Sequence, residues 1–363
     1  MITVRLACLV SILLLSTISE GQKASFTSQK VSKEKDLESV FGTVDIGNLA
    51  AINSEDLDYN AVLVEDGVIF TSTRGKTEDK NGKKVKSYKK KLSTLFYSRL
   101  EDGHLNRPQP LEGDVNSNYH ESSASFTKDG KRMFFTRNNT KGKNRKGVVH
   151  LKIYSAEKIN GEWTNIQELS FNSDNFSTAH PSISPDGGRL YFASNRKGGF
   201  GGMDIYVSHF KRGEWQEPIN VGPVINTTKN EAFPFISADD ILYFSSDKPG
   251  GHGGLDVYRS KKMRPDSERT WRHTQNIGTP FNSNNDDFGF YINKEESAGL
   301  FTSGRDGGKG RDDIYFWQLK EKKMFQASVN PDDIEPAPLD GKPGKQKVID
   351  IENIFVDTKQ TKE

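Results

Sequence analysis

The stretch "SISPDGGRLYFASNRKGGFGGMDIYVS", residues 182–208, contains short apolar runs separated by turn residues and a glycine-rich segment. It has close copies downstream, "FPFISADDILYFSSDKPGGHGGLDVYRS" from Phe233 and "FGFYINKEESAGLFTSGRDGGKGRDDIYFWQ" from Phe288. Two more divergent copies begin at Asn60 and Ser122. Because self-similarity at a fixed period is the signature of a repeat architecture, we infer five copies of one structural unit.

An Asn-Ser or Asn-Thr pair before each copy gives an independent count. The pairs, called Asn markers below, begin at Asn53, Asn116, Asn172, Asn226 and Asn282. The first marker precedes the first copy, and no marker follows the last copy. The N-terminal segment therefore supplies a piece that the last copy lacks. Repeats of about 55 residues with four strands each predict an all-β, five-bladed β-propeller closed by an N-terminal strand.

The composition agrees with many short strands. The chain is 33% hydrophobic and has 33 glycines, and its apolar runs alternate with Gly, Asn, Asp and Ser. This pattern is typical of strands joined by turns, and no long stretch shows the apolar period of a helix. A phosphate-binding loop would be followed by a helix, whereas a strand follows each glycine-rich segment. We therefore interpret these segments as loops between antiparallel strands.

The two ends of the chain differ from the repeats. Residues 1–21 combine a basic start, a short apolar run and small residues, as a secretory signal peptide does. Cys8, the single cysteine, lies inside this segment, so the exported chain would contain no thiol and no disulfide. We expect a linker at 22–40, the propeller at 41–320, a tail at 321–363 and a periplasmic location.

The repeat quoted first resembles the WD40-like repeat of the TolB type, in the variant common in envelope proteins of Bacteroidota. The resemblance covers residues 41–320 and is strongest in the third and fourth copies. It implies a periplasmic propeller that binds proteins. Similar propellers recur in type IX secretion and gliding machinery, among them a plug that associates with the translocon barrel. Because "KVIDIENIFVDTKQTKE" resembles only the opening strand of an OmpA-like domain, we expect no peptidoglycan anchor in this chain.

A carboxylate follows the Asn marker by five residues in four of the copies. These acids are Asp58, Glu121, Glu231 and Asp287. The third copy has Ser177 or Thr178 at this place, with His180 nearby. We expect the acids to ring one mouth of the central channel, where a structural role, a cation site and a glycosidase-like acid pair are all open. Their near-symmetry argues against catalysis, which needs two carboxyls in different environments.

Another acid, Asp204, Asp256 or Asp313, follows the glycine-rich segment in each of the last three copies. An acidic side chain that enters a strand after a glycine turn usually accepts hydrogen bonds from the turn amides. We expect that role here, with metal binding as the alternative.

The first two copies carry basic loops instead of glycine-rich ones. Residues 74–91 hold nine Lys or Arg against two acids, and residues 137–152 hold six and no acid. Both segments occupy the same place in adjacent repeats and should lie on one face. They suit solvated loops or a docking surface for an acidic partner, and an exported chain makes nucleic acid an unsuitable partner. The predicted contact residues are Lys83, Lys84, Lys86, Lys89, Lys90, Lys91, Lys141, Lys143, Arg145 and Lys146.

The tail begins as a polar segment with several prolines and ends in "VIDIENIFVD", which is too apolar for a solvated end. Ile351, Ile354 and Phe355 are predicted to dock. Both strand addition to a partner's sheet edge and packing onto the chain's own propeller are open.

No nucleophile elbow, HExxH or CxxC pattern occurs, and the seven histidines include no pair at metal-ligand spacing. The sequence therefore predicts neither an enzyme nor a cofactor or metal. The leading hypothesis is a non-enzymatic periplasmic propeller that mediates protein–protein interaction with an outer-membrane or periplasmic complex and meets the membrane only through partners. The alternative is a glycan-binding or hydrolytic propeller with its site at the channel mouth.

Overall fold

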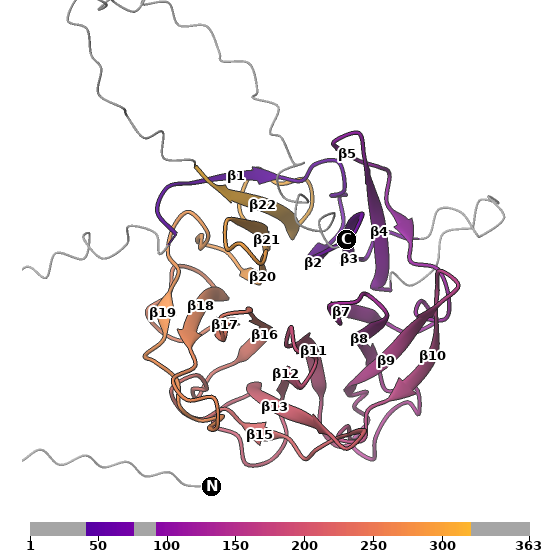
Figure 1. Ribbon diagram of the computed structural model, residues 1–363, viewed down its shortest axis with the longest axis vertical. Helices are drawn as coiled ribbons and strands as arrows, with labels where there is room; N and C mark the ends of the chain where they lie inside the picture. The colour runs from indigo at the N-terminus through magenta and orange to yellow at the C-terminus, as the bar shows by residue number, and fades with distance from the viewer. Residues whose placement is uncertain (1–40, 76–91, 321–363) are drawn as a thin grey trace, which may run out of the picture. The chain divides into compact units, whose positions relative to one another are not determined.

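The computed structural model describes residues 41–75 and 92–320, which form five antiparallel sheets arranged as blades around a central axis (Figure 1). These residues contain strands, turns and loops but no helix. Accordingly, none of them belongs to a helix with the length and hydropathy of a membrane span. The prediction of an all-β, five-bladed propeller is confirmed.

Each blade starts with an inner strand and proceeds outward. Blade 1 consists of β2 (Asp58–Val64), β3 (Gly67–Ser72), β4 (Thr94–Glu101), β5 (His104–Leu105) and β6 (Gln109–Pro110). Blade 2 consists of β7 (Glu121–Phe126), β8 (Arg132–Asn138), β9 (Leu151–Ile159) and β10 (Glu162–Glu168). Blade 3 consists of β11 (Thr178–Ile183), β12 (Arg189–Ser194), β13 (Asp204–Lys211), β14 (Glu214–Trp215) and β15 (Ile219–Asn220). Blade 4 consists of β16 (Glu231–Ile236), β17 (Ile241–Ser246), β18 (Asp256–Lys261) and β19 (Gln275–Asn276). Blade 5 consists of β20 (Asp287–Ile292), β21 (Ala298–Ser303), β22 (Asp313–Leu319) and β1 (Val44–Asn48).

The ring is closed by β1, which pairs antiparallel with β22 from Val44↔Leu319 to Asn48↔Tyr315. Phe41 precedes β1, and its ring centroid lies 4.9 Å from that of Trp317 and 5.4 Å from that of Phe281. The outermost strand of the last blade thus comes from the start of the propeller, as the Asn markers predicted.

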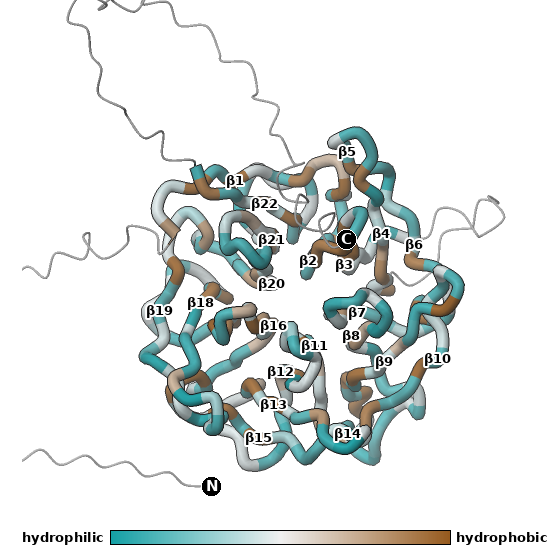
Figure 2. Tube along the Cα trace, viewed as in Figure 1, coloured by the Kyte–Doolittle hydropathy of each residue, from teal (hydrophilic) through white to brown (hydrophobic). Residues whose placement is uncertain are grey.

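The hydrophobic core lies within and between blades. One cluster joins Tyr191, Ile205 and Val221 of the third repeat to Phe244 and Trp271 of the fourth. Hydrophobic residues lie mostly along the strands and hydrophilic ones mostly in the connections (Figure 2). Because apolar side chains of adjacent sheets pack against each other, the blades depend on their neighbours for a complete core.

The side-chain amide of each Asn marker binds the third strand of the preceding blade, an arrangement we call the Asn clasp. Asn226 Oδ1 accepts a hydrogen bond from Ile205 N at 2.7 Å, and Asn226 Nδ2 donates to Ile205 O at 2.9 Å. The same two bonds join Asn53 to Ile314, Asn116 to Leu95, Asn172 to Ile153, and Asn282 to Val257. Buried backbone groups need hydrogen-bond partners. The clasp gives the strand amide its acceptor and adds a second donor to the carbonyl, which also accepts a backbone N–H, as Ile205 O does from Val221 N at 3.2 Å.

The glycine-rich loops pack against the neighbouring blade. A Cβ atom on Gly201 would lie 2.1 Å from Lys229 O, and one on Gly253 would lie 2.2 Å from Asn285 O. Backbone can approach backbone this closely only where the residue has no side chain. The glycine-rich segments are therefore loops that fit two blades together.

Deleting residues 41–54 removes β1, Phe41 and the Asn53 clasp, and leaves the long edge of β22 unpaired, which is an aggregation hazard. We expect severe loss of solubility, measured as the soluble fraction after expression. The milder Phe41→Ala variant should stay folded and lose up to about 3 kcal/mol in free energy of unfolding. A truncated chain that remains soluble and melts like the parent would contradict closure by this segment.

Candidate functional site

The four predicted acids occupy the first positions of inner strands and are fully buried. Asp58, Glu121, Glu231 and Asp287 begin β2, β7, β16 and β20, and each has 0% exposed area. Each accepts hydrogen bonds from its own Asn marker pair. Glu231, for example, accepts from Thr227 N at 2.8 Å and from Thr227 Oγ1 at 2.7 Å. The acids therefore begin the inner strands as predicted, and each is buried and bound by donors of its own loop, which favours the structural role among the alternatives.

Three of these acids form ion pairs with an arginine of the same blade. Arg74 lies 2.5 Å from Asp58, Arg137 lies 3.0 Å from Glu121, and Arg305 lies 3.2 Å from Asp287. In blade 4, Ser246 Oγ donates to Glu231 at 2.8 Å instead, and Lys248 comes two residues after Ser246. The arginines also donate to backbone carbonyls of the loop that carries the Asn marker, as Arg305 does to Phe281 O at 2.5 Å.

The cation of each blade also lies over an aromatic pair from the second and third strands. The Arg305 guanidinium carbon is 5.0 Å from the Phe301 ring centroid and 4.9 Å from that of Tyr315. The equivalent groups are Arg74 with Phe70 and Phe96, Arg137 with Phe135 and Tyr154, Arg196 with Phe192 and Tyr206, and Lys248 with Phe244 and Tyr258. Cation–π contact and ion pairing thus act together at the same structural point in the repeat.

Blade 3 keeps the cation but lacks the acid. Thr178 stands at the carboxylate position, and its buried Oγ1 has no hydrogen-bond partner. Arg196 still donates to Phe171 O at 3.2 Å, and its ion-pair contact is the exposed Glu217 at 3.8 Å. Burial lowers the pKa of the Arg196 guanidinium. In blade 3 the cation therefore contacts the aromatic pair and the loop carbonyl without a buried carboxylate beside it.

The acids that follow the glycine-rich loops accept hydrogen bonds from loop amides. Asp204 accepts from Phe200 N at 2.6 Å and from Gly201 N at 3.0 Å. Asp256 accepts from His252 N at 2.6 Å, and Asp313 accepts from Gly310 N at 2.9 Å. These contacts support the turn-stabilising role expected for the three residues.

The electrostatic environment of the inner acids also supports a structural role. Burial raises the pKa of Glu121, Glu231 and Asp287, and the neighbouring hydroxyl, amide and arginine donors oppose that shift. Within residues 41–75 and 92–320, no three His, Cys, Asp or Glu side chains gather as metal ligands would. Each acid accepts hydrogen bonds from the loop that leads into its own strand.

A cavity of about 910 Å³ occupies the central channel. It is lined by the later residues of the inner strands and by the turns that follow them, including Val64, Phe126, Pro185, Phe235 and Tyr291. We call the end of the propeller that carries these turns, residues 65–66, 127–131, 184–188, 237–240 and 293–297, the turn face. The opposite end, with the loops 139–150, 195–203, 247–255 and 304–312, is the loop face. The cavity extends from the middle of the channel to the turn face.

Every inner strand is bulged at its third residue, where φ is positive. These residues are Asn60, Ser123, His180, Phe233 and Gly289. The ladder shifts register at each of these points. A bulge turns the strand and leaves a backbone group unpaired, which then needs another partner.

Four of the five bulge amides find that partner on the preceding blade. Ser123 N donates to Thr71 Oγ1 at 3.0 Å, and His180 N donates to Thr136 Oγ1 at 2.9 Å. In blade 3, alanine stands where the other blades have threonine or serine, and Phe233 N lies 3.4 Å from His180 Nδ1 instead. Burial lowers the pKa of His180 to about 3, which keeps this nitrogen available as an acceptor.

His180 and its neighbours also place aromatic rings across the channel. Its imidazole stacks on the Phe233 ring with centroids 3.8 Å apart, and Phe233 lies 4.7 Å from Phe288. His180, Phe233 and Pro234 are all part of the cavity lining. The cavity therefore has a floor that combines aromatic surface with a single neutral imidazole.

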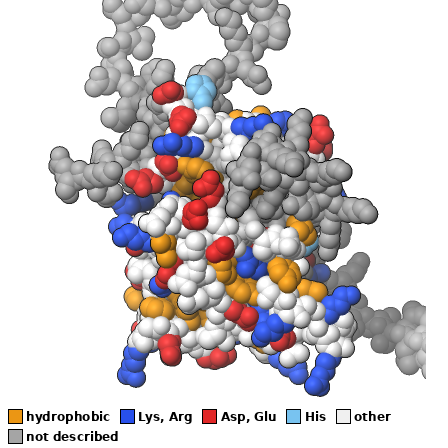
Figure 3. All heavy atoms as spheres, turned by 90° about the vertical axis from the view of Figure 1, so that its right-hand side faces the viewer, with side chains coloured by type: hydrophobic (Ala, Val, Ile, Leu, Met, Phe, Trp, Pro, Cys, Tyr) orange, Lys and Arg blue, Asp and Glu red, His pale blue; other side chains and the backbone are white. Residues whose placement is uncertain are grey.

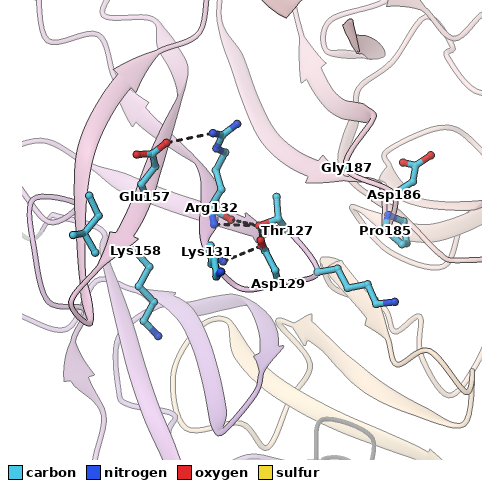
Figure 4. A pocket seen from close by; sticks show the side chains of 11 residues that line it. Thr127, Asp129, Lys131, Arg132, Glu157, Lys158, Pro185, Asp186 and Gly187 are labelled. Atoms are coloured by element: carbon cyan, nitrogen blue, oxygen red, sulfur yellow. Dashed lines mark hydrogen bonds and ion pairs between the residues drawn. The ribbon is translucent and has the colours of Figure 1, made fainter. Parts of the chain in front are cut away.

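A second cavity of about 560 Å³ lies on the turn face between blades 2 and 3 (Figure 4). Arg132 at one wall forms an ion pair with Glu157 at 3.3 Å. Asp129 accepts hydrogen bonds from Thr127 Oγ1 at 2.6 Å and from Lys131 N at 3.1 Å. Because these polar groups satisfy each other, the groove offers no evident catalytic arrangement.

The basic loop of blade 2, residues 139–150, is fixed by its own side chains. Asn144 Oδ1 accepts from Lys146 N at 2.9 Å and from Val148 N at 3.0 Å, and Asn144 Nδ2 lies 3.0 Å from His150 Nε2. The predicted contact residues Lys141, Lys143, Arg145 and Lys146 are all exposed. None of these four forms an ion pair with a carboxylate of the described part of the chain. Val148 beside them is 46% exposed.

Several predicted residues lie outside the described ranges. They are Lys83, Lys84, Lys86, Lys89, Lys90 and Lys91 of the first basic loop, and Ile351, Ile354 and Phe355 of the tail. The signal peptide at 1–21 and the linker at 22–40 also lie there. These assignments stay predictions.

The arginine and lysine partners and the aromatic channel floor were not expected from the sequence. A signal for the cations was present, because "STR", "SNR", "SDK" and "SGR" each begin at the last residue of the second strand in four repeats. His180 and Phe233 had no such signal, since each replaces a different residue of the repeat and gains its surroundings only when adjacent blades pack together.

Comparison with known proteins assigns the chain to no family. No family model matches the chain, and no curated protein matches it. Among solved structures, a gluconolactonase from Xanthomonas campestris is 13% identical, with a TM-score of 0.40 over 78% of this chain and 92% of that one. TolB from Acinetobacter baumannii is 15% identical, with a TM-score of 0.36 over 77% and 65%. A family 117 glycoside hydrolase produced by Zobellia galactanivorans is 13% identical, with a TM-score of 0.47 over 76% and 90%. Similarity of this degree does not distinguish an enzyme from a binding protein.

Replacing Arg305 by methionine should cost more stability than the same change at Arg196. Arg305→Met leaves Asp287 buried without its cation, and because the arginine side chain is 20% exposed we expect a loss of about 2–4 kcal/mol. Arg196→Met removes a similar aromatic contact but strands no buried carboxylate, so its loss should be at least about 1 kcal/mol smaller. Urea unfolding of both variants measures the difference, and equal losses would contradict the structural role of the buried acid.

Proposed function

We propose that this chain is a non-enzymatic binding propeller that docks onto a protein complex of the outer membrane or periplasm through the basic loop of blade 2. The observation that carries the proposal is a set of four exposed cations, Lys141, Lys143, Arg145 and Lys146, on a loop held by internal hydrogen bonds. A loop that is already ordered loses little further freedom on binding, which favours its use as a contact.

The charge distribution points to an acidic partner. The loop concentrates positive charge on the loop face, whereas the side of the propeller shown in Figure 3 mixes basic, acidic and apolar side chains. A local patch of one sign speeds the encounter with a complementary patch and makes the rate depend on salt. The exposed Val148 and Val149 add apolar surface beside the cations, as contact regions often contain.

The sequence of the neighbouring repeat also contains a basic loop. Residues 76–91, which lie outside the described part, belong to the corresponding connection of blade 1 and add further lysines. The resemblance of the repeats to those of Bacteroidota envelope propellers supports a type IX secretion translocon as the class of partner. Export to the periplasm is part of the proposal and rests on the signal-like residues 1–21.

The hydrolytic alternative has less support from the geometry. A glycosidase needs two carboxyl groups that flank a substrate and differ in protonation. Asp58, Glu121 and Asp287 are instead buried and paired with arginines, and Glu231 is enclosed by hydroxyl and amide donors. A binding role at the loop face needs none of these acids.

Changing Lys141, Lys143, Arg145 and Lys146 together to glutamine should weaken association with isolated outer membranes by roughly tenfold or more, equivalent to about 1.4 kcal/mol per tenfold. Binding of the parent protein should itself weaken as salt rises, because exposed charges are screened. Co-sedimentation at low and high salt measures both effects.

The matched control changes Lys128, Lys131, Lys211 and Lys261 to glutamine, since these lysines are exposed at the opposite end of the strands. It removes the same charge and should leave association and its salt dependence unchanged. Equal weakening by both variants would mean that association depends on the net charge of the protein and not on this loop. Unchanged association in the loop variant would contradict docking through this loop.

A further inference from the structure

Blade 3 holds its arginine in the same pose as blade 5, although no buried acid accompanies it. Arg305 of blade 5 donates from Nη2 both to Phe281 O and to the carboxylate of Asp287. Arg196 of blade 3 makes the corresponding bond from Nη2 to Phe171 O at 3.2 Å. The Arg196 guanidinium therefore presents the same edge to the position at which blade 5 places its carboxylate.

The serine or threonine of the Asn marker supplies further donors to the acid in the other four blades. In blade 5, Ser283 donates to Asp287 from N at 2.5 Å and from Oγ at 2.8 Å. The corresponding residue of blade 3 is Ser173, whose Oγ accepts a hydrogen bond from Asn175 N at 3.1 Å. Within the described ranges, neither the N–H nor the hydroxyl of Ser173 has an acceptor.

Thr178 stands where the other blades have the acid, because it pairs with Ser194 as Glu231 pairs with Ser246. Its side chain is buried, and its Oγ1 atom has no hydrogen-bond partner. A buried hydroxyl without a partner is unfavourable and calls for an explanation. By their correspondence with the other blades, donors of Arg196, Ser173 and Thr178 surround one position that lacks an acceptor.

The charge of Arg196 is also poorly balanced. Its side chain is 9% exposed, against 20% for Arg305. Its ion-pair contact in the described ranges is Glu217, which lies 3.8 Å away and is 90% exposed. Asp174, in the loop that leads into β11, instead binds Lys152 at 2.7 Å. Because a buried cation without a close counter-charge is unfavourable, this site favours the binding of an anion.

The loop that leads into β11 is one residue longer than its counterparts and adds Phe176 to the site. The Phe176 ring centroid lies 4.9 Å from the Arg196 guanidinium carbon, in addition to the rings of Phe192 and Tyr206. An aromatic ring attracts a cation but carries no net charge. Phe176 therefore packs on the guanidinium without neutralising it.

We propose that blade 3 binds a chloride ion at the place of the carboxylate that the other blades possess. The ion accepts hydrogen bonds from Arg196, Ser173 and Thr178 and balances the buried guanidinium. Because threonine is nearly as large as the aspartate of blades 1 and 5, the site suits a monatomic anion better than phosphate or sulfate. This inference concerns the interior of the blade and does not rest on the proposed docking function.

Thermal unfolding at constant ionic strength tests the proposal, with chloride replaced stepwise by isethionate. An anion that binds only the folded state should raise the Tm by about 3–5 °C for each tenfold increase in chloride above its dissociation constant. Thr178→Asp supplies the carboxylate of blades 1 and 5 and should remove this dependence. The matched control, Thr43→Asp, adds the same charge at an exposed position of blade 5 and should retain it.

Thr178→Val keeps the shape of the side chain without its hydroxyl and should shift the chloride dependence to higher concentrations. An equal chloride response in the parent and in Thr178→Asp would overturn the proposal. So would equal Tm values in chloride and isethionate, which would mean that Phe176 alone takes the place of the acid.

A direct measurement does not depend on how the variants fold. Crystals of the parent protein that contain bromide should give an anomalous peak within hydrogen-bond distance of Arg196 and Thr178. Anomalous peaks confined to the protein surface would show an adventitious ion only and would overturn the proposal.

Discussion

Five asparagine side chains form hydrogen bonds to the backbone of the third strand of the preceding blade, and these bonds hold the ring together. Each Asn clasp gives the third strand of one blade both an acceptor and a donor, and does so from the loop that leads into the next blade. The clasp therefore couples the end of one repeat to the beginning of the next. Asn53 makes the same bonds to Ile314 across the closure, so the ring has no repeat that lacks them. The glycine-rich loops, the buried acids and the bulged inner strands are all positioned relative to this connection.

The division between structure and binding follows from that constraint. Groups that are repeated from blade to blade, such as the acid beside its cation and aromatic pair, are used inside the protein. Groups that differ from one repeat to the next are not required for these shared contacts. The basic loop replaces a glycine-rich loop in blade 2, and His180 and Phe233 replace different residues at the bulges. The departure in blade 2 thus marks the loop that we propose for binding.

Much of the fold was predictable because repetition multiplies a weak signal. A single Asn-Ser pair says little, but its recurrence before every copy fixed the blade count and revealed that the N-terminal segment completes the last blade. The candidate site was less predictable. Residue spacing placed Glu121 and Asp287 at the starts of inner strands, yet it could not show that the side chains turn away from the channel toward their own loops and arginines. The stacking of His180 on Phe233 depends on two blades meeting, so it became visible only in three dimensions.

Hydrogen exchange at the backbone amides of Leu95, Ile153, Ile205, Val257 and Ile314 tests the Asn clasp most directly, because each of these N–H groups donates to an asparagine side chain. If the clasp holds the blades together, all five amides should exchange as slowly as those in the middle of the inner strands, through opening of the whole propeller. Exchange of these amides at the rate of exposed loop amides, while the inner strands stay protected, would contradict the account.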